Sequence, residues 1–151
     1  MTELISTIDN IVKFGLQPNI PVADNCKVLE RNLVTIYTLY FDIRYQFDGR
    51  DYSDFSIPNF PNIRQNVESN FPEFGFYKTV LDYDDIENLK ECGVGDAIDD
   101  LTDIINDLLE IMWRIKNNSL ADGLWYFESI FKSHTQQHIL DLLTYMKQTN
   151  V

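Results

Sequence analysis

Two histidines four residues apart, His134 and His138, have the spacing in this sequence that most clearly suggests chemistry. They are the only histidines in the chain, and they lie on the apolar side of a predicted C-terminal helix. Residues at i and i+4 share one face of a helix, so both imidazoles could bind the same metal ion. The alternative is a pair of partly buried histidines whose ring nitrogens are satisfied by hydrogen bonds.

A metal site needs at least a third ligand, which has to come from outside the histidine pair. Carboxylates are available nearby in the sequence and on a second predicted helix over 96–117. A divalent ion held in this way would activate water, and a free carboxylate would act as the base. The candidate ligands are His134, His138, Asp141 and Asp99, with Asp100 and Glu128 as further carboxylates.

The helix predicted over 96–117 also carries a row of acidic residues. At about 100° per residue these side chains cluster on one side, and the apolar seam points almost the opposite way. We therefore expect an acidic ridge that faces away from the core and binds a basic partner. The alternative is a solvated helix face without a partner. The acidic ridge consists of Asp96, Asp99, Asp100, Asp103, Asp107 and Glu110.

The charge balance of the chain limits its partners. The 151 residues include 24 acids and 12 bases, which gives a net charge of −12. Residues 82–110 alone hold eleven acids and one base. Such a charge argues against binding nucleic acid or an anionic membrane, because phosphate groups need a cationic surface. The longest uncharged apolar run, residues 33–41, is too short to span a bilayer, and the first 15 residues show no signal-peptide pattern. We expect a cytoplasmic protein in which Cys26 and Cys92 stay reduced.

Hydrophobic periodicity predicts an all-α fold. Helices are expected over about 3–14, from Asp24 to about 43, over 62–71, over 96–117 and over 120–147. Proline and glycine predict a loop over 48–62 and an irregular, aromatic-rich and acidic segment over 71–95, with one helical turn near 84–90 and no hairpin. The whole chain, 1–151, should form one antiparallel bundle of four or five helices.

Three segments resemble an uncharacterised bacterial family, catalogued as domain of unknown function 5063. They are residues 71–77 (FPEFGFY), 95–104 (GDAIDDLTDI) and 131–138 (FKSHTQQH). The family pattern has an acidic D-D-L-x-D-I helix and a closing helix with an H-W-G-x-H element. His134 and His138 match its two histidines, whereas Thr135 and Gln136 replace the Trp-Gly between them. The resemblance spans roughly residues 70–146; it implies a small helical bundle of bacterial origin and carries no known activity.

Three functions are consistent with these features. The first is a non-enzymatic acidic interaction protein, such as an inhibitor or immunity protein for a basic toxin or nuclease, which needs no cofactor. The second is a metal-binding helical bundle or hydrolase that uses the histidine pair. The third is a structural or regulatory partner in a larger assembly, with the aromatic segment 71–77 as its contact surface. The sequence favours the first and leaves the oligomeric state open.

Overall fold

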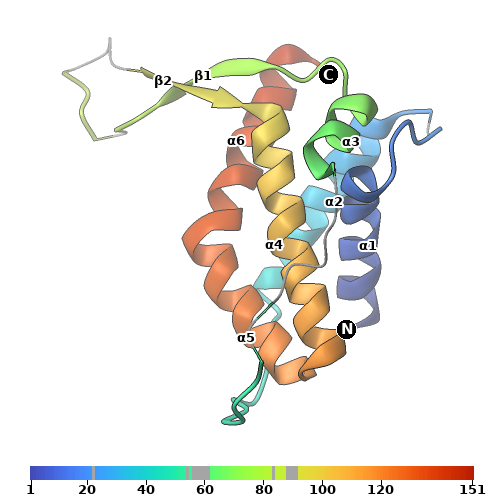
Figure 1. Ribbon diagram of the computed structural model, residues 1–151. Coiled ribbons are helices and arrows are strands. Elements are labelled where there is room, and N and C mark those ends of the chain that lie inside the picture. The colour runs from blue at the N-terminus through green and yellow to red at the C-terminus, as the bar shows by residue number, and fades with distance from the viewer. Residues whose placement is uncertain (22, 54, 56–61, 83, 88–91) are drawn as a thin grey trace.

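The computed structural model describes residues 1–151 except 22, 54, 56–61, 83 and 88–91 (Figure 1). The protein is mostly helical, with one small two-stranded sheet. The helices are α1 (Thr2–Leu16), α2 (Asn25–Tyr40), α3 (Ile63–Asn70), α4 (Ala97–Asn117), α5 (Leu120–Ile130) and α6 (Gln136–Thr149). A short π-helical segment, η1 (Phe131–Thr135), connects α5 and α6. The strands are β1 (Phe76–Val80) and β2 (Cys92–Asp96). No described helix is long and apolar enough to cross a membrane.

Side-chain caps fix where three of the helices begin. The Asp24 carboxylate accepts a hydrogen bond from the backbone N–H of Lys27, and the Ser119 hydroxyl accepts one from Asp122. Asp96 caps α4 in the same way through the N–H of Ile98. Each cap satisfies a backbone donor that the first turn of a helix leaves without a partner. The predicted starts at Asp24 and Ser119 are thereby confirmed.

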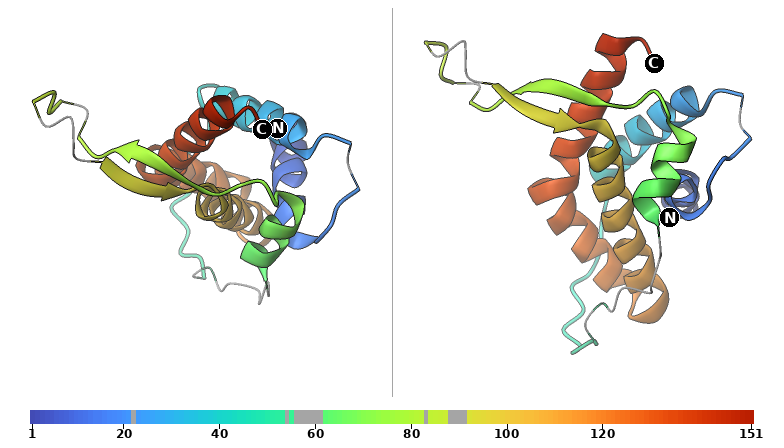
Figure 2. Two further views of the ribbon diagram at one scale, coloured as in Figure 1. Left: turned by 90° about the horizontal axis from the view of Figure 1, so that it is seen from above. Right: turned by 45° about the horizontal axis from the view of Figure 1, so that its top comes forward.

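Helix α4 lies at the centre of the fold, with α1 and α3 on one side and α5 and α6 on the other (Figures 1 and 2). The predicted apolar seam is buried and includes Ile98, Leu101, Ile105, Leu108 and Met112. A second line of buried residues runs along the face toward α6 and consists of Asp100, Ile104, Asp107 and Ile111. Other helices pack against α4 on more than one side, so the face that carries Asp100 and Asp107 is buried as well.

The helix predicted over 120–147 is interrupted by the π-helical segment. Residues 131–135 form wider i→i+5 turns, so the register of the side chains changes just before α6 begins. The Thr135 hydroxyl bonds back to the Ile130 carbonyl at 3.4 Å within this turn. Short π segments inside α-helices occur frequently at functional sites, and this one includes His134.

The prediction that residues 71–95 contain no hairpin is wrong. Strands β1 and β2 pair antiparallel, with Tyr77 opposite Gly95 and Lys78 opposite Val94. The hairpin extends away from the helices as an arm, most clearly in Figure 2. The sequence pattern of the second strand was weak, because two of the five β2 residues are glycines, which are rare in strands. Residues 84–87 include a turn in place of the predicted helix, and 88–90 lie outside the described residues.

The aromatic segment before the hairpin packs mainly inward. Phe71 and Phe74 are buried, stack on each other at 4.7 Å between ring centroids, and join the hydrophobic core. Only Phe76, the first residue of β1, is strongly exposed. In the predicted loop over 48–62, residues 48–53 form neither helix nor strand, and 54 and 56–61 are not described.

Replacing Gly123 with alanine should destabilise the protein, although alanine is the better helix former. A Cβ at this position would lie 2.3 Å from Cγ1 of Ile115 and 3.0 Å from the Ile115 backbone nitrogen, where α5 meets α4. We expect a loss of about 1–3 kcal/mol in the free energy of unfolding, measured by urea denaturation. Gly75→Ala is the control, since a Cβ there meets nothing within 4 Å. Equal stability of the two variants would contradict the close packing of α4 on α5.

Candidate metal centre

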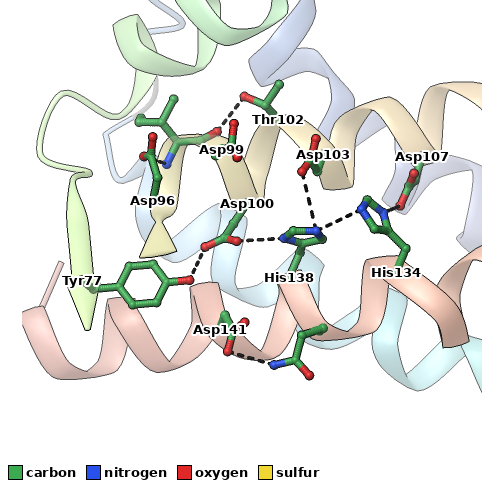
Figure 3. Close-up of polar contacts among 12 residues, drawn as sticks. Tyr77, Asp96, Asp99, Asp100, Thr102, Asp103, Asp107, His134, His138 and Asp141 are labelled. Carbon is green, nitrogen blue, oxygen red and sulfur yellow. Dashed lines mark hydrogen bonds and ion pairs between the residues drawn. The ribbon is translucent and has the colours of Figure 1, made fainter. Parts of the chain in front are cut away.

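The two histidines face each other at the surface between α4 and the α5–α6 helix. The Nε2 atoms of His134 and His138 are 3.2 Å apart, and the ring centroids are 4.5 Å apart (Figure 3). The sequence predicted that both imidazoles share one side of a helix, and the structure brings their Nε2 atoms together. Since each ring has one further nitrogen, its orientation depends on what that nitrogen contacts.

A buried aspartate of α4 holds the other nitrogen of each histidine. His134 Nδ1 lies 2.9 Å from a carboxylate oxygen of Asp107, and His138 Nδ1 lies 2.8 Å from one of Asp100. Carboxylate oxygens accept hydrogen bonds, so Nδ1 is the donor in both contacts. When both rings are neutral, the two Nε2 lone pairs then face each other and are available to bind a metal. This carboxylate–histidine arrangement is the one that orients imidazole ligands at metal centres.

Asp103 completes a three-residue cluster. Its carboxylate oxygen lies 3.6 Å from His138 Nε2, and one ligand atom from each of Asp103, His134 and His138 lies within 4.8 Å of the others. Asp103 lies on α4, one turn before Asp107. Its side chain points toward His138 from α4, above the histidines in Figure 3.

The spacing of the cluster fits a small tetrahedral ion. Two nitrogens bound to tetrahedral zinc at 2.0–2.1 Å lie about 3.3 Å apart, close to the observed separation of the two Nε2 atoms. The side chains of His134 and Asp103 are 43% and 35% exposed. With three protein ligands and an open side toward solvent, a fourth position would be left for water.

The π-helical segment contributes to the position of His134. It ends at Thr135, whose fully buried hydroxyl donates to the same Asp107 oxygen at 2.6 Å. Asp107 therefore receives two hydrogen bonds from adjacent residues. This pair of bonds fixes both the carboxylate and the imidazole, because neither can rotate without breaking a buried contact.

The base of the hairpin arm reaches the same network. The Tyr77 hydroxyl of β1 donates to the second oxygen of Asp100 at 2.5 Å, so Asp100 lies between Tyr77 and His138. A Cβ on Gly95 would come within 2.6 Å of the Tyr77 ring and hydroxyl, so glycine leaves the space that the ring occupies. This contact connects the arm to the histidine–aspartate cluster through one buried carboxylate.

The environment shifts the pKa of several of these groups. The hydrogen bond to Asp100 raises the pKa of His138, and burial acts in the opposite direction. Burial raises the pKa of Asp103, although the neighbouring histidines partly compensate. Burial and the bond to Asp100 raise the pKa of Tyr77, which stays protonated and acts as a donor. Strongly coupled groups of this kind gather at functional sites.

The expectation that the acidic ridge faces away from the core is wrong for two of its members. Asp100 and Asp107 are 6% and 9% exposed and point toward α6. The prediction assumed that only the side of α4 with the apolar seam is buried, whereas other helices pack against α4 on more than one side. The other four acids also have partners: Arg64 contacts Asp96 and Asp99, Arg114 contacts Glu110, and His138 contacts Asp103.

The remaining predicted ligands lie elsewhere. Asp99 is 63% exposed and pairs with Arg64 at 2.9 Å, and Asp141 accepts a hydrogen bond from Gln137. Glu128 accepts one from Tyr45. The structure therefore brings Asp103 to the histidines, and not Asp99 or Asp141. Asp103 and Asp107 are four residues apart, as are His134 and His138. This equal spacing on two helices was the sequence feature that could have indicated that the two pairs face each other.

Comparison of the chain with protein-family models, with curated proteins and with solved structures finds no match. The resemblance to the bacterial family of unknown function stays a prediction. The functional argument therefore depends on the geometry of the site itself.

Replacing Tyr77 with phenylalanine should lower the free energy of unfolding, because Asp100 loses a hydrogen-bond donor. The buried carboxylate would lose its phenolic donor, and hydrogen bonds to charged groups contribute about 1.5–3 kcal/mol. We expect a loss of that size in the free energy of unfolding in urea. Tyr45→Phe removes a hydroxyl bound to the exposed Glu128 and should change stability little. Matching losses in the two variants would contradict a special role for the Tyr77–Asp100 contact.

Proposed function

We propose that this protein binds one divalent transition-metal ion, of the zinc class, through His134, His138 and Asp103. The observation that carries the proposal is the facing pair of Nε2 atoms, 3.2 Å apart, with each Nδ1 held by a buried carboxylate. A histidine that is only structural needs one such contact, whereas here both rings are oriented so that their free nitrogens meet. Asp100 and Asp107 are the orienting residues of this site.

The ligand types favour a transition metal over magnesium or calcium. Two imidazole nitrogens suit zinc, nickel, cobalt or iron, whereas the hard cations prefer oxygen ligands. Two histidines and one carboxylate with an open side are also found in catalytic zinc sites and in iron sites that bind a further ligand. The acidic surroundings add to the attraction for a cation, because Asp100, Asp103 and Asp107 all lie on the adjacent face of α4.

The chemistry available at such a site is the activation of a bound water molecule. A metal ion of this class lowers the pKa of its bound water, which then attacks an electrophile. The part that this chain supplies is the orientation of two ligands and the access of solvent along the exposed edges of His134 and Asp103. The negative field of the neighbouring aspartates favours neutral or cationic substrates over phosphate esters.

The direct test is titration of the metal-free, untagged protein. We expect one zinc ion per chain by isothermal titration calorimetry, and a rise in melting temperature with zinc but not with the same concentration of magnesium. Equal shifts with zinc and magnesium would point to diffuse attraction to carboxylates. That result, or the absence of saturable zinc binding, would overturn the proposal.

Binding of a basic partner through the acidic ridge, as an inhibitor or immunity protein would do, stays a prediction. Each of its six acids has an intramolecular partner, so little of its charge is free for another protein. We also propose that the helical frame is an antiparallel bundle of four or five helices in one domain. This is supported by the packing of α4 on α1, α5 and α6.

A further inference from the structure

The β1–β2 hairpin has an exposed apolar face that the metal site does not explain. Opposite residues of an antiparallel pair share a face, so one side of the hairpin carries Phe76, Lys78, Val80, Cys92, Val94 and Asp96. Phe76 and Val94 are each 76% exposed, and Val80 is 50% exposed. Exposed apolar groups gathered on one face mark an interaction site more often than isolated ones do.

The backbone of the arm is also available. The sheet has two strands, so among the described residues each strand has an outer edge with no strand beside it. An isolated two-stranded ribbon is only marginally stable in water, and a third strand would add hydrogen bonds along its edge. The inner face is less open, because Tyr77 packs against Gly95 and Leu81 packs against Gly93.

The charge around the arm determines which partner fits. Beyond β1, the exposed residues Asp82, Asp84 and Glu87 are acidic, and Lys78 is the one base within the two strands. A second copy of the chain has the same acidic residues and a net charge of −12, so the two copies would repel each other. An anionic membrane or a nucleic acid would be repelled for the same reason. A basic extended segment would be attracted along the arm and could place its apolar residues on the outer face.

We propose that the β1–β2 hairpin binds a basic segment of another protein as an added strand, whose alternate apolar side chains extend the outer face formed by Phe76, Val80 and Val94. This proposal is independent of the metal site and assigns the predicted basic partner to the arm in place of the acidic ridge. The main-chain hydrogen bonds at the edge supply affinity, and the apolar contacts and charge supply selectivity.

The probe is a fluorescein-labelled peptide of about nine alternating lysine and valine residues, the length of an ordinary strand. We expect saturable binding by fluorescence anisotropy, at least about tenfold tighter than that of the glutamate–valine peptide of the same length. Bound peptide should also slow alkylation of the exposed Cys92. Cys26 is an internal reference, because burial and the bond to Glu73 raise its pKa to about 12.

Two lysine substitutions that change the net charge equally distinguish binding at the hairpin from attraction to the overall charge of the protein. Val94→Lys should weaken binding of the lysine–valine peptide at least about tenfold. Val34→Lys, at an exposed apolar residue of α2, should leave it almost unchanged. Retained zinc binding and melting temperature in Val94→Lys would confirm that the fold is intact.

Three results would overturn the proposal. The first is no saturable binding of the lysine–valine peptide, and the second is equal weakening by the two substitutions. The third is a concentration-dependent dimer in sedimentation velocity that Val94→Lys abolishes, since the arm would then bind a second copy of this chain.

Discussion

His138→Ala should lower the affinity of the protein for zinc by at least about a hundredfold. The variant loses one of three ligands, a larger change than the ten- to hundredfold loss typical of removing an orienting residue. It also leaves the buried Asp100 carboxylate without the hydrogen bond that His138 donates to it. The affinity is measured by competition with a chromophoric chelator, and circular dichroism checks that the helices remain.

The matched control for this prediction is Asp141→Asn. Asp141 lies three residues after His138 on the same helix, and its carboxylate contacts Gln137 and not the histidines. We expect its zinc affinity to stay within a fewfold of the unmodified protein, since only a surface charge changes. A loss in Asp141→Asn as large as that in His138→Ala would contradict the assignment of Asp103 as the third ligand.

Asp100→Asn should lower zinc affinity by about ten- to a hundredfold, although Asp100 does not touch the metal position. The carboxylate accepts from both His138 and Tyr77, and an amide has one oxygen and one NH₂ group to offer them. If the NH₂ group faces Nδ1, the proton of the imidazole moves to Nε2, and that nitrogen can no longer bind a metal. If the oxygen faces Nδ1, the ligand becomes less basic and the tyrosine hydroxyl meets another donor.

Asp99→Asn is the control, because it makes the same change of charge one residue away. Asp99 is exposed and pairs with Arg64 on the other side of α4. Its substitution should reduce zinc affinity only through the weakened general field, which salt screens. Equal losses in the two variants would mean that charge, and not the orientation of His138, determines the affinity. Asp107→Asn should behave like Asp100→Asn through His134.

The helical frame could be predicted because apolar spacing and caps are local properties. Helix α4 shows this most clearly: the apolar seam from Ile98 to Met112 follows from the sequence, and it is found buried. The π-helical turn at Phe131–Thr135 could not be predicted, because its residues also fit a regular helix. It becomes apparent only from the backbone of the structure, where residues 131–135 form the wider turns.

The arrangement of the histidine–aspartate cluster could be predicted in part. The spacing of His134 and His138 was sufficient to place both rings on one side of a helix. The choice of carboxylates failed because it depended on which face of α4 is buried, and that is decided by helices distant in sequence. Asp100 and Asp107 were assigned to a ridge that faces away from the core, yet both are buried, and each contacts a histidine, His138 of α6 and His134 of η1 respectively. The hairpin, with its glycine-rich second strand, gave no strong local signal.

The central claim is tested most directly by X-ray absorption at the zinc edge, on protein loaded with one equivalent of zinc. We expect two imidazole nitrogens at about 2.0–2.1 Å, with the multiple scattering of histidine rings, and oxygens from Asp103 and water that complete a four-coordinate shell. A shell of oxygens alone would contradict it, because zinc would then be held by surface carboxylates and the facing histidines would serve only the packing of α6 on α4.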